Sequence, residues 1–397
     1  MKKTGLYSSV VVALLLSFCL VCVSSAWADD FKWPRMLTIA TPGTSSGVFA
    51  ATNGWGPIMQ GDTKMRIRVV PEDGETGRYQ RLTELRDFDL AAISIADTRF
   101  SQEGVHGYST TPPHPTRFVW HANDTPWLFV VRGDSDIKTI YDIKKKGVRV
   151  SLSSQSPPMM VAVQKALPKF VGWTPEEARE NWIFVPAGSY AENCRSITDG
   201  KTDITWVAPV SSVIYEMEGH PKGIRFLDQP LSDKKGWDGW LSIRPTHIPA
   251  KIEFGAPSSI GHEGLSSSFN YWARPDLDEE LVYRLAKWFH ENFDRYKGVH
   301  VLATRMSIEM TRWFLDHSPL PVHKGTIRYL REVGKWTAED DKWNQDAIDL
   351  QNRWLAARKA AQEEAKSKGI KLHWENEEFL KIFKKHTEGL PVFRVRL

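Results

Sequence analysis

Short apolar runs alternate with amphipathic stretches along the first half of the chain. The strand-like runs are Met36–Ala40, Arg66–Val70, Leu90–Ile95, Leu128–Arg132, Val148–Leu152, Ile183–Val185 and Ile204–Val207. The stretches with helical character are Gly47–Met59, Gly77–Arg86, Pro157–Phe170 and Ala187–Thr198. This alternation predicts an α/β fold with mostly parallel strands. In such sheets ligands bind at the carboxyl ends of the strands.

The second half of the chain has a different pattern. Trp237–Trp272 is rich in Gly, Pro and Ser and is expected to form extended strands, whereas Asp278–Phe293 has the apolar stripe of a core helix. Ala338–Phe383 is rich in Ala, Glu, Lys and Gln and is interrupted by Gly369. We expect one or two surface helices there, packed on one part of the fold.

Charged residues of this tail are expected to be solvated. The run Arg358–Lys371 is interpreted as a solvated helix face, and the acid pairs Asp340–Asp341 and Glu363–Glu364 as surface charges. Acid–base chemistry is therefore not assigned to them.

The N-terminus has the layout of a secretory signal peptide. Lys2 and Lys3 precede the apolar run Val10–Cys22, and Ala26-Trp27-Ala28 gives a small-residue cleavage pattern. A signal peptide over residues 1–28 predicts an exported, periplasmic protein. Its removal would leave Cys194 as the last of three cysteines, so no intramolecular disulfide is expected.

Length and charge limit the remaining possibilities. A mature chain of roughly 370 residues is long for one core and predicts two lobes. The formal net charge of +4 gives no basic stripe for nucleic acid. The 17 tryptophans exceed what a core of this size needs, so some are expected to line a pocket or a partner surface.

Two hydroxyl-rich turns connect strands to helices. Pro42–Gly47 follows the first strand, and Leu152–Ser156 precedes Pro157-Pro158. Helix N-termini after such turns offer unpaired N–H groups to an anion. The alternative is that the Ser and Thr side chains merely cap helices. The presence of two such turns favours a site in which both turns hold one small anion between them.

An enzyme remains an alternative on one motif. Gly43, Ser45 and Gly47 fit the G-x-S-x-G pattern of a serine hydrolase, with Asp203 and His262 as candidate partners. The serine follows the first strand instead of one deep in the sheet order, which disfavours that fold.

No cofactor or metal is expected. The histidines, among them His114, His121, His247, His262, His317 and His323, lack metal-ligand spacing, and no phosphate-binding glycine motif is present.

Four passages of the chain form a further pattern: Thr38–Phe49, Asp87–Thr98, Asp199–Trp206 and Pro319–Gly334. Together these passages resemble the TAXI class of solute-binding proteins of tripartite ATP-independent periplasmic (TRAP) transporters. The last is the most specific, being close to P-x-H-x-G-A-x-x-Y-x-x-E-x-G with Thr326 in place of the usual Ala.

The resemblance implies a type II periplasmic-binding-protein fold without catalytic activity. It implies a discontinuous first lobe (29–133 and 246–337), a second lobe (134–245), hinge strands, and a C-terminal helical extension (338–397). It also implies a small organic acid as ligand and membrane permease subunits as partners. We expect a monomer. A sensor subunit with the same fold would have the same pattern.

The ligand site implied by these patterns consists of the two hydroxyl-rich turns and of residues that form the walls of a pocket. Loop N–H groups and the hydroxyls of Thr44, Ser46, Ser154 and Ser156 are expected to hold a carboxylate, with Arg78 adding a charge-assisted contact. Thr76 and Tyr79 stand where the family has Ser and Asn, so selectivity is expected to differ. The remaining candidates for the site are Ser45, Phe49, Gln155, Trp206, Pro209 and Trp240.

Overall fold

A computed structural model describes residues 31–394 and 396 of this chain. The predicted signal peptide lies outside the described residues. Residues 35–397 form one compact unit. Its strands are β1 (Met36–Thr41), β2 (Arg66–Pro71), β3 (Leu90–Ser94), β4 (Arg117–Arg132), β5 (Arg149–Ser153), β6 (Ile183–Ala187), β7 (Thr205–Val207), β8 (Ile224–Leu227), β9 (Ile248–Lys251) and β10 (Glu263–Ala273).

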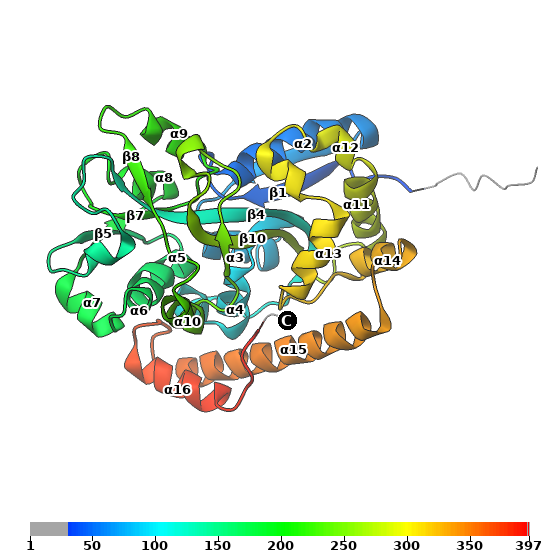
Figure 1. The fold of residues 1–397 in the computed structure, drawn as a ribbon. Helices are drawn as coiled ribbons and strands as arrows, with labels where there is room; N and C mark the ends of the chain where they lie inside the picture. The colour runs from blue at the N-terminus through cyan, green and yellow to red at the C-terminus, as the bar shows by residue number, and fades with distance from the viewer. Residues whose placement is uncertain (1–30, 395, 397) are drawn as a thin grey trace, which may run out of the picture. The chain divides into compact units, whose positions relative to one another are not determined.

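Helices surround these strands (Figure 1). They are α2 (Gly47–Thr63), α3 (Glu75–Thr83), α4 (Ala96–Glu103), α5 (Pro157–Val161), α6 (Leu167–Phe170), α7 (Pro175–Asn181), α8 (Tyr190–Arg195), α9 (Ser212–Glu218), α10 (Lys234–Ile243), α11 (Glu279–Glu291), α12 (Phe293–Tyr296), α13 (Ile308–Asp316), α14 (Lys324–Glu332), α15 (Ala338–Ser367) and α16 (Glu377–Thr387). A π-helical turn, Ala162–Ala166, joins α5 to α6.

The main sheet is mixed. Its strand order is β2-β1-β3-β10-β4-β7, with β8 paired to β4 and β9 paired to β10. β1 runs parallel to β2 and β3, whereas β10 runs antiparallel to β3 and β4. β5 and β6 form a separate parallel pair. The predicted α/β class, with the mixed sheets of the type II fold, is therefore confirmed. The expectation of mostly parallel strands was wrong, because β4 and β10 pair antiparallel with each of their neighbours.

β4 connects the two parts of the main sheet. Its first part, Arg117–Trp127, pairs with β10, and its last residues, Leu128–Arg132, pair with β7 and β8. All of its residues between the two ends are buried. The sequence predicted only Leu128–Arg132, because polar residues such as Asn123 and Asp124 interrupt the apolar pattern upstream.

The expectation of extended structure from Trp237 onward was wrong at its start, because Lys234–Ile243 forms helix α10. Asp233 caps this helix by accepting a 2.9 Å hydrogen bond from the Gly236 N–H. Trp237 and Trp240, three residues apart, are both buried on one helix face. Trp237 packs edge-on against Phe170, with 5.2 Å between ring centroids.

The predicted C-terminal helices are present as α15 and α16, and the chain turns between them at Gly369, whose φ is +69°. Their shared core consists of Ala361, Ala365, Phe379, Ile382 and Phe383. In Figure 1, α15 is the long orange helix and α16 the red one beside it. This packing explains why the tail is helical, since apolar residues of both helices leave water together.

The expectation that Arg358 lies on a solvated face was wrong. Its side chain is 0% exposed. Its guanidinium donates to the carbonyls of Ser101 at 2.5 Å and Tyr108 at 2.9 Å. A Cβ on Gly104, which has φ +68°, would lie 2.1 Å from the Arg358 Nε. Arg358 thus fastens α15 to α4 and the turn after it, and glycine at 104 leaves room for it.

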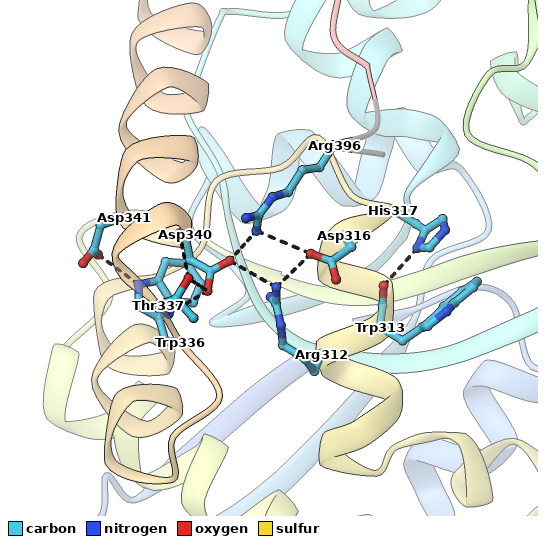
Figure 2. Close-up of polar contacts among 9 residues, drawn as sticks. All are labelled: Arg312, Trp313, Asp316, His317, Trp336, Thr337, Asp340, Asp341 and Arg396. Carbon is cyan, nitrogen blue, oxygen red and sulfur yellow. Dashed lines mark hydrogen bonds and ion pairs between the residues drawn. The ribbon is translucent and has the colours of Figure 1, made fainter.

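Asp340 was also expected at the surface and is instead fully buried. It completes a capping box, accepting a 2.7 Å hydrogen bond from the Thr337 N–H at the start of α15. Arg312 donates to the same carboxylate at 3.1 Å, and Arg396 pairs with it as well. Figure 2 shows both guanidinium groups between Asp340 and Asp316. The network ties the end of the chain to α13 and α15.

Candidate functional site

A cavity of about 50 Å³ lies at the carboxyl ends of β1, β2, β5 and β7, against the central strands β4 and β10. This is where the α/β pattern predicted a ligand site. The lining consists of Pro42, Ser46, Gly47, Val48, Asp73, Glu75, Arg78, Thr125, Trp127, Gln155, Ser156, Met159, Tyr190, Ala208, Val210, Ser211, Phe269 and Leu302. The cavity therefore draws on both segments of the predicted first lobe and on the segment 134–245.

The two hydroxyl-rich turns cap their own helices. The Ser46 hydroxyl accepts from the Phe49 N–H at 3.1 Å, and the Ser156 hydroxyl accepts from the Met159 N–H at 3.4 Å. The capping alternative is thus confirmed for both serines. Their side chains line the cavity but already serve the first turns of α2 and α5.

Asp73 bridges the two sides of the cavity. Its Oδ1 accepts from the Gly43 N–H at 3.3 Å, and its Oδ2 accepts from the Tyr190 N–H at 3.0 Å, at the start of α8. A Cβ on Gly43 would lie 2.7 Å from the Asp73 Oδ1, so a side chain at position 43 would displace this carboxylate. The Asp73 carboxylate thus occupies N–H groups of the kind that the sequence assigned to a ligand anion.

Glu75 makes a second bridge. It is 8% exposed, and the Ser156 hydroxyl donates to its Oε2 at 2.6 Å. Burial and the nearby Glu75 carboxylate raise the pKa of Asp97 well above its usual range, which favours the protonated form of Asp97. The Tyr108 hydroxyl donates to Asp97 at 3.3 Å.

Arg78 lines the cavity but is engaged by its own loop. It is 1% exposed, and its Nη1 donates to the carbonyls of Glu72 at 2.5 Å and Asp73 at 3.2 Å. Its Nη2 lies 3.8 Å from Glu75 Oε1. The guanidinium therefore holds the turn between β2 and α3 together.

Aromatic rings form part of the wall. Trp127 of β4 lines the cavity, and its ring stacks on Trp206 with 4.5 Å between centroids. Tyr190 lies edge-on to Trp127 at 6.3 Å, and Phe269 of β10 also lines the space. The Trp127 Nε1 is buried and has no hydrogen-bond partner. This N–H is a donor that a ligand can satisfy.

The structure brings together four of the predicted site residues: Ser46, Arg78, Gln155 and Ser156 line the cavity. The others lie outside its lining. Thr44 and Ser154 are exposed, and Ser45, Phe49 and Thr76 are partly buried. Pro209, Tyr79, Trp206 and Trp240 are buried.

The buried candidates have structural partners. The Tyr79 hydroxyl donates to the His114 carbonyl at 2.7 Å. The Trp240 Nε1 donates to the His247 Nδ1 at 3.0 Å. Trp206 supports the cavity wall from behind, through its stacking on Trp127.

Sequence reasoning missed Asp73, Glu75, Trp127, Tyr190 and Phe269. Asp73 and Glu75 directly follow a predicted strand and precede a helix, so their position was a usable signal. Trp127 and Phe269 lie on central strands whose full length and pairing emerged only from the fold.

The motif that most specifically resembled a known family belongs to the scaffold. His323 caps α14 by accepting a 3.2 Å hydrogen bond from the Gly325 N–H, and Thr326 donates to the Val119 carbonyl at 2.8 Å. A Cβ on Gly325 would lie 2.5 Å from the Glu279 carbonyl oxygen, so α14 approaches α11 closely here.

A family model described as the NMT1-like family matches residues 39–334, which hold the main sheet and the whole cavity lining. The chain belongs to the NMT1-like family. No curated protein matches this NMT1-like chain.

Several solved structures are similar to this chain at low sequence identity. MatC from Rhodopseudomonas palustris with bound malate is 12% identical, covering 79% of this chain and 100% of that chain, with a TM-score of 0.48. A phosphonate transporter binding protein from Pseudomonas aeruginosa is 12% identical, with 83% and 99% coverage and a TM-score of 0.46. The alkanesulfonate-binding protein SsuA from Xanthomonas axonopodis pv. citri is 13% identical, with 76% and 91% coverage and a TM-score of 0.41.

Two negative findings apply to the part of the NMT1-like chain that the structure describes. No helix there is long and apolar enough to cross a membrane. No group of three or more His, Cys, Asp or Glu residues there is placed to hold a metal ion.

Proposed function

We propose that this chain is the periplasmic solute-binding subunit of a TRAP-type secondary transporter. It closes its two lobes on a small solute and presents the solute to the membrane permease subunits. The cavity carries this proposal, because Asp73–Tyr190 and Glu75–Ser156 hydrogen bonds cross it from one predicted lobe to the other. Contacts of this kind break when lobes separate, which makes them suited to a clamp.

The proposed lobes are residues 29–133 with 246–337, and residues 134–245. β4 leaves the first at its end, Arg132, and the chain returns before β9. Both connections between the proposed lobes lie next to paired strands. This favours a hinge motion of one lobe against the other over unrestrained movement of the two lobes. The extension 338–397 packs on the first lobe through Arg358 and has no assigned part in closure.

The TRAP assignment rests on the four passages that resemble the TAXI class. Export rests on the Lys pair, apolar run and Ala26-Trp27-Ala28 pattern. The intact mass of the secreted protein tests this step. Cleavage after Ala28 is expected, and a lipid-bearing species that begins at Cys22 would contradict a soluble periplasmic protein.

Binding without turnover is the proposed activity. Among the described residues, no hydrogen bond joins the Ser45 hydroxyl to a histidine or an acid, and the candidate partners are engaged elsewhere. Asp203 pairs with Arg149 at 2.6 Å, and His262 with Asp228 at 2.8 Å. Recovery of unchanged solute after long incubation is expected. Turnover that Ser45→Ala abolishes would overturn the proposal.

The general test is a thermal-shift screen of small solutes with the mature protein. A ligand that binds only the folded state raises the free energy of unfolding by mass action, and Tm rises with it. At a ligand concentration of 100 times Kd the increase in the free energy of unfolding is about 2.7 kcal/mol. X-ray scattering then checks whether the same solute makes the protein more compact. A carboxylate ligand, as predicted from the sequence, would find the Arg78 Nε without a partner, whereas the Nη1 would have to leave its present carbonyl partners to reach the ligand.

A further inference from the structure

The charge of the cavity lining differs from that of an anion site. Two carboxylates, Asp73 and Glu75, and one guanidinium, Arg78, are the charged groups in the lining described above. The Arg78 Nη atoms already face two carbonyls and Glu75. An incoming anion would therefore meet two acids, and of the Arg78 guanidinium only the buried Nε is without a partner.

Both acids retain acceptor capacity. Asp73 accepts from two backbone N–H groups, and Glu75 accepts from Ser156. A carboxylate offers about four lone-pair sites. Each carboxylate therefore still presents negatively charged oxygen lone pairs to a positive charge in the cavity.

The wall residues suit a positive charge as well. The aromatic residues Trp127, Tyr190 and Phe269 line the small cavity. Aromatic faces attract ammonium groups, and the attraction grows when water is excluded. Trp127 is 8% exposed, and its unpartnered Nε1–H needs a ligand acceptor. The buried Gln155 Oε1, also without a partner, needs a donor.

We propose that the cavity binds a small organic cation. Its ammonium group is held by Asp73 and Glu75 against the aromatic wall. A hydroxyl or carbonyl oxygen at its other end accepts from the Trp127 Nε1. This inference rests on the proposed solute-binding function and specifies the chemical class of the solute.

Choline is the probe, because it combines a quaternary ammonium with one hydroxyl. Its uncharged isostere 3,3-dimethyl-1-butanol tests the charge, and succinate tests the anion alternative. Titration calorimetry and thermal shift of the mature protein are expected to show choline binding at least about tenfold more tightly than the isostere, a difference of about 1.4 kcal/mol. Succinate is expected to leave Tm unchanged.

Variants locate the charge. Glu75→Gln and Asp73→Asn are each expected to weaken choline binding by about tenfold or more. Glu180→Gln is the matched control, because Glu180 is exposed on α7 and lies outside the lining, and its choline affinity is expected to be unchanged. The wild-type comparison of choline with its isostere stands if a variant fails to fold.

The possible outcomes distinguish a failure of the cation assignment from a failure of the proposed solute-binding function. Equal affinity for choline and the isostere, or a Tm shift with succinate alone, would overturn the cation assignment. A shift with succinate would still support solute binding. No binding of any of the three probes also overturns the cation assignment, whereas the wider screen and scattering decide the solute-binding function.

Discussion

Ser156 Oγ donates a 2.6 Å hydrogen bond to Glu75 Oε2, although the two residues are 81 positions apart. Ser156 caps α5, and Glu75 begins α3. One hydroxyl therefore stabilises a helix start and joins two segments that face each other across the cavity.

Ser156→Ala is expected to destabilise the protein by about 1 to 3 kcal/mol, because it leaves a buried carboxylate without its donor and removes a cap. Urea unfolding measures the change. Ser154→Ala is the matched control, since Ser154 is exposed and donates only to the Ala187 carbonyl. It is expected to lose about 0.5 kcal/mol or less. Equal losses in the two variants would contradict the inferred role of Ser156.

Arg358→Ala is expected to lower the free energy of unfolding by about 3 kcal/mol or more. Hydrogen bonds to a charged group contribute about 1.5 to 3 kcal/mol each, and the substitution strands several buried carbonyls. Thermal and urea unfolding provide the measurement.

Lys359→Ala is the control for Arg358, because Lys359 is the next residue and its side chain is 71% exposed. A change within about 0.5 kcal/mol is expected there. A loss as small in Arg358→Ala would mean that α15 does not depend on the buried guanidinium.

Asp97→Asn is expected to change how stability depends on pH. Burial raises the pKa of Asp97 above its usual value of 3.8. Between pH about 4 and the raised pKa the folded state holds a proton that the unfolded state has lost, so the Asp97 contribution to stability falls as pH rises. The stability of Asp97→Asn relative to wild type should therefore increase from pH 5 to pH 8.

Urea unfolding at both pH values checks the Asp97 prediction, since contributions from other groups cancel in the difference. Asp199→Asn, at an exposed acid, serves as the control and should run parallel to wild type. A difference between Asp97→Asn and wild type that stays constant with pH would show that Asp97 does not take up a proton on folding.

Glu364 is expected to link the packing of α15 and α16 to acid pH. Lys368, His386 and Lys385 lower the pKa of Glu364 to about 2. A depressed folded pKa stabilises fully above the ordinary value near 4.5, and this stabilisation is lost as pH falls towards 2. Glu364→Gln should flatten the loss of stability in that window, measured as the urea midpoint against pH. Glu363→Gln, at a neighbouring side chain that is 65% exposed, should follow the wild type.

The sequence by itself determined the local elements. Apolar runs and helical periodicity identified β1 to β3 and β5 to β7, because these patterns report which face of each element is buried. They also identified the helices α2, α3, α5, α6, α8, α11, α15 and α16 but missed the others. The turns after β1 and β5, which the sequence predicted to hold a ligand, both contribute residues to the cavity lining. Capping was recognisable from the serines at 46 and 156, although its competition with ligand binding was left open.

Only the tertiary structure decided what these local features face. The 16-residue strand β4 is buried along its length despite its polar centre, because β10, β7 and β8 pair along its edges and helices α11, α13 and α14 contact it. The sequence predicted surface charges at Arg358 and Asp340. The structure buries both, because a carbonyl of α4 accepts from Arg358 and the guanidinium of Arg396 pairs with Asp340. The charged groups of the cavity lining, Asp73, Glu75 and Arg78, were likewise identified as neighbours of Tyr190 and Ser156 only from contacts between distant segments. A local pattern specifies periodicity and caps, whereas burial of a charged group is tolerated only where distant groups satisfy it.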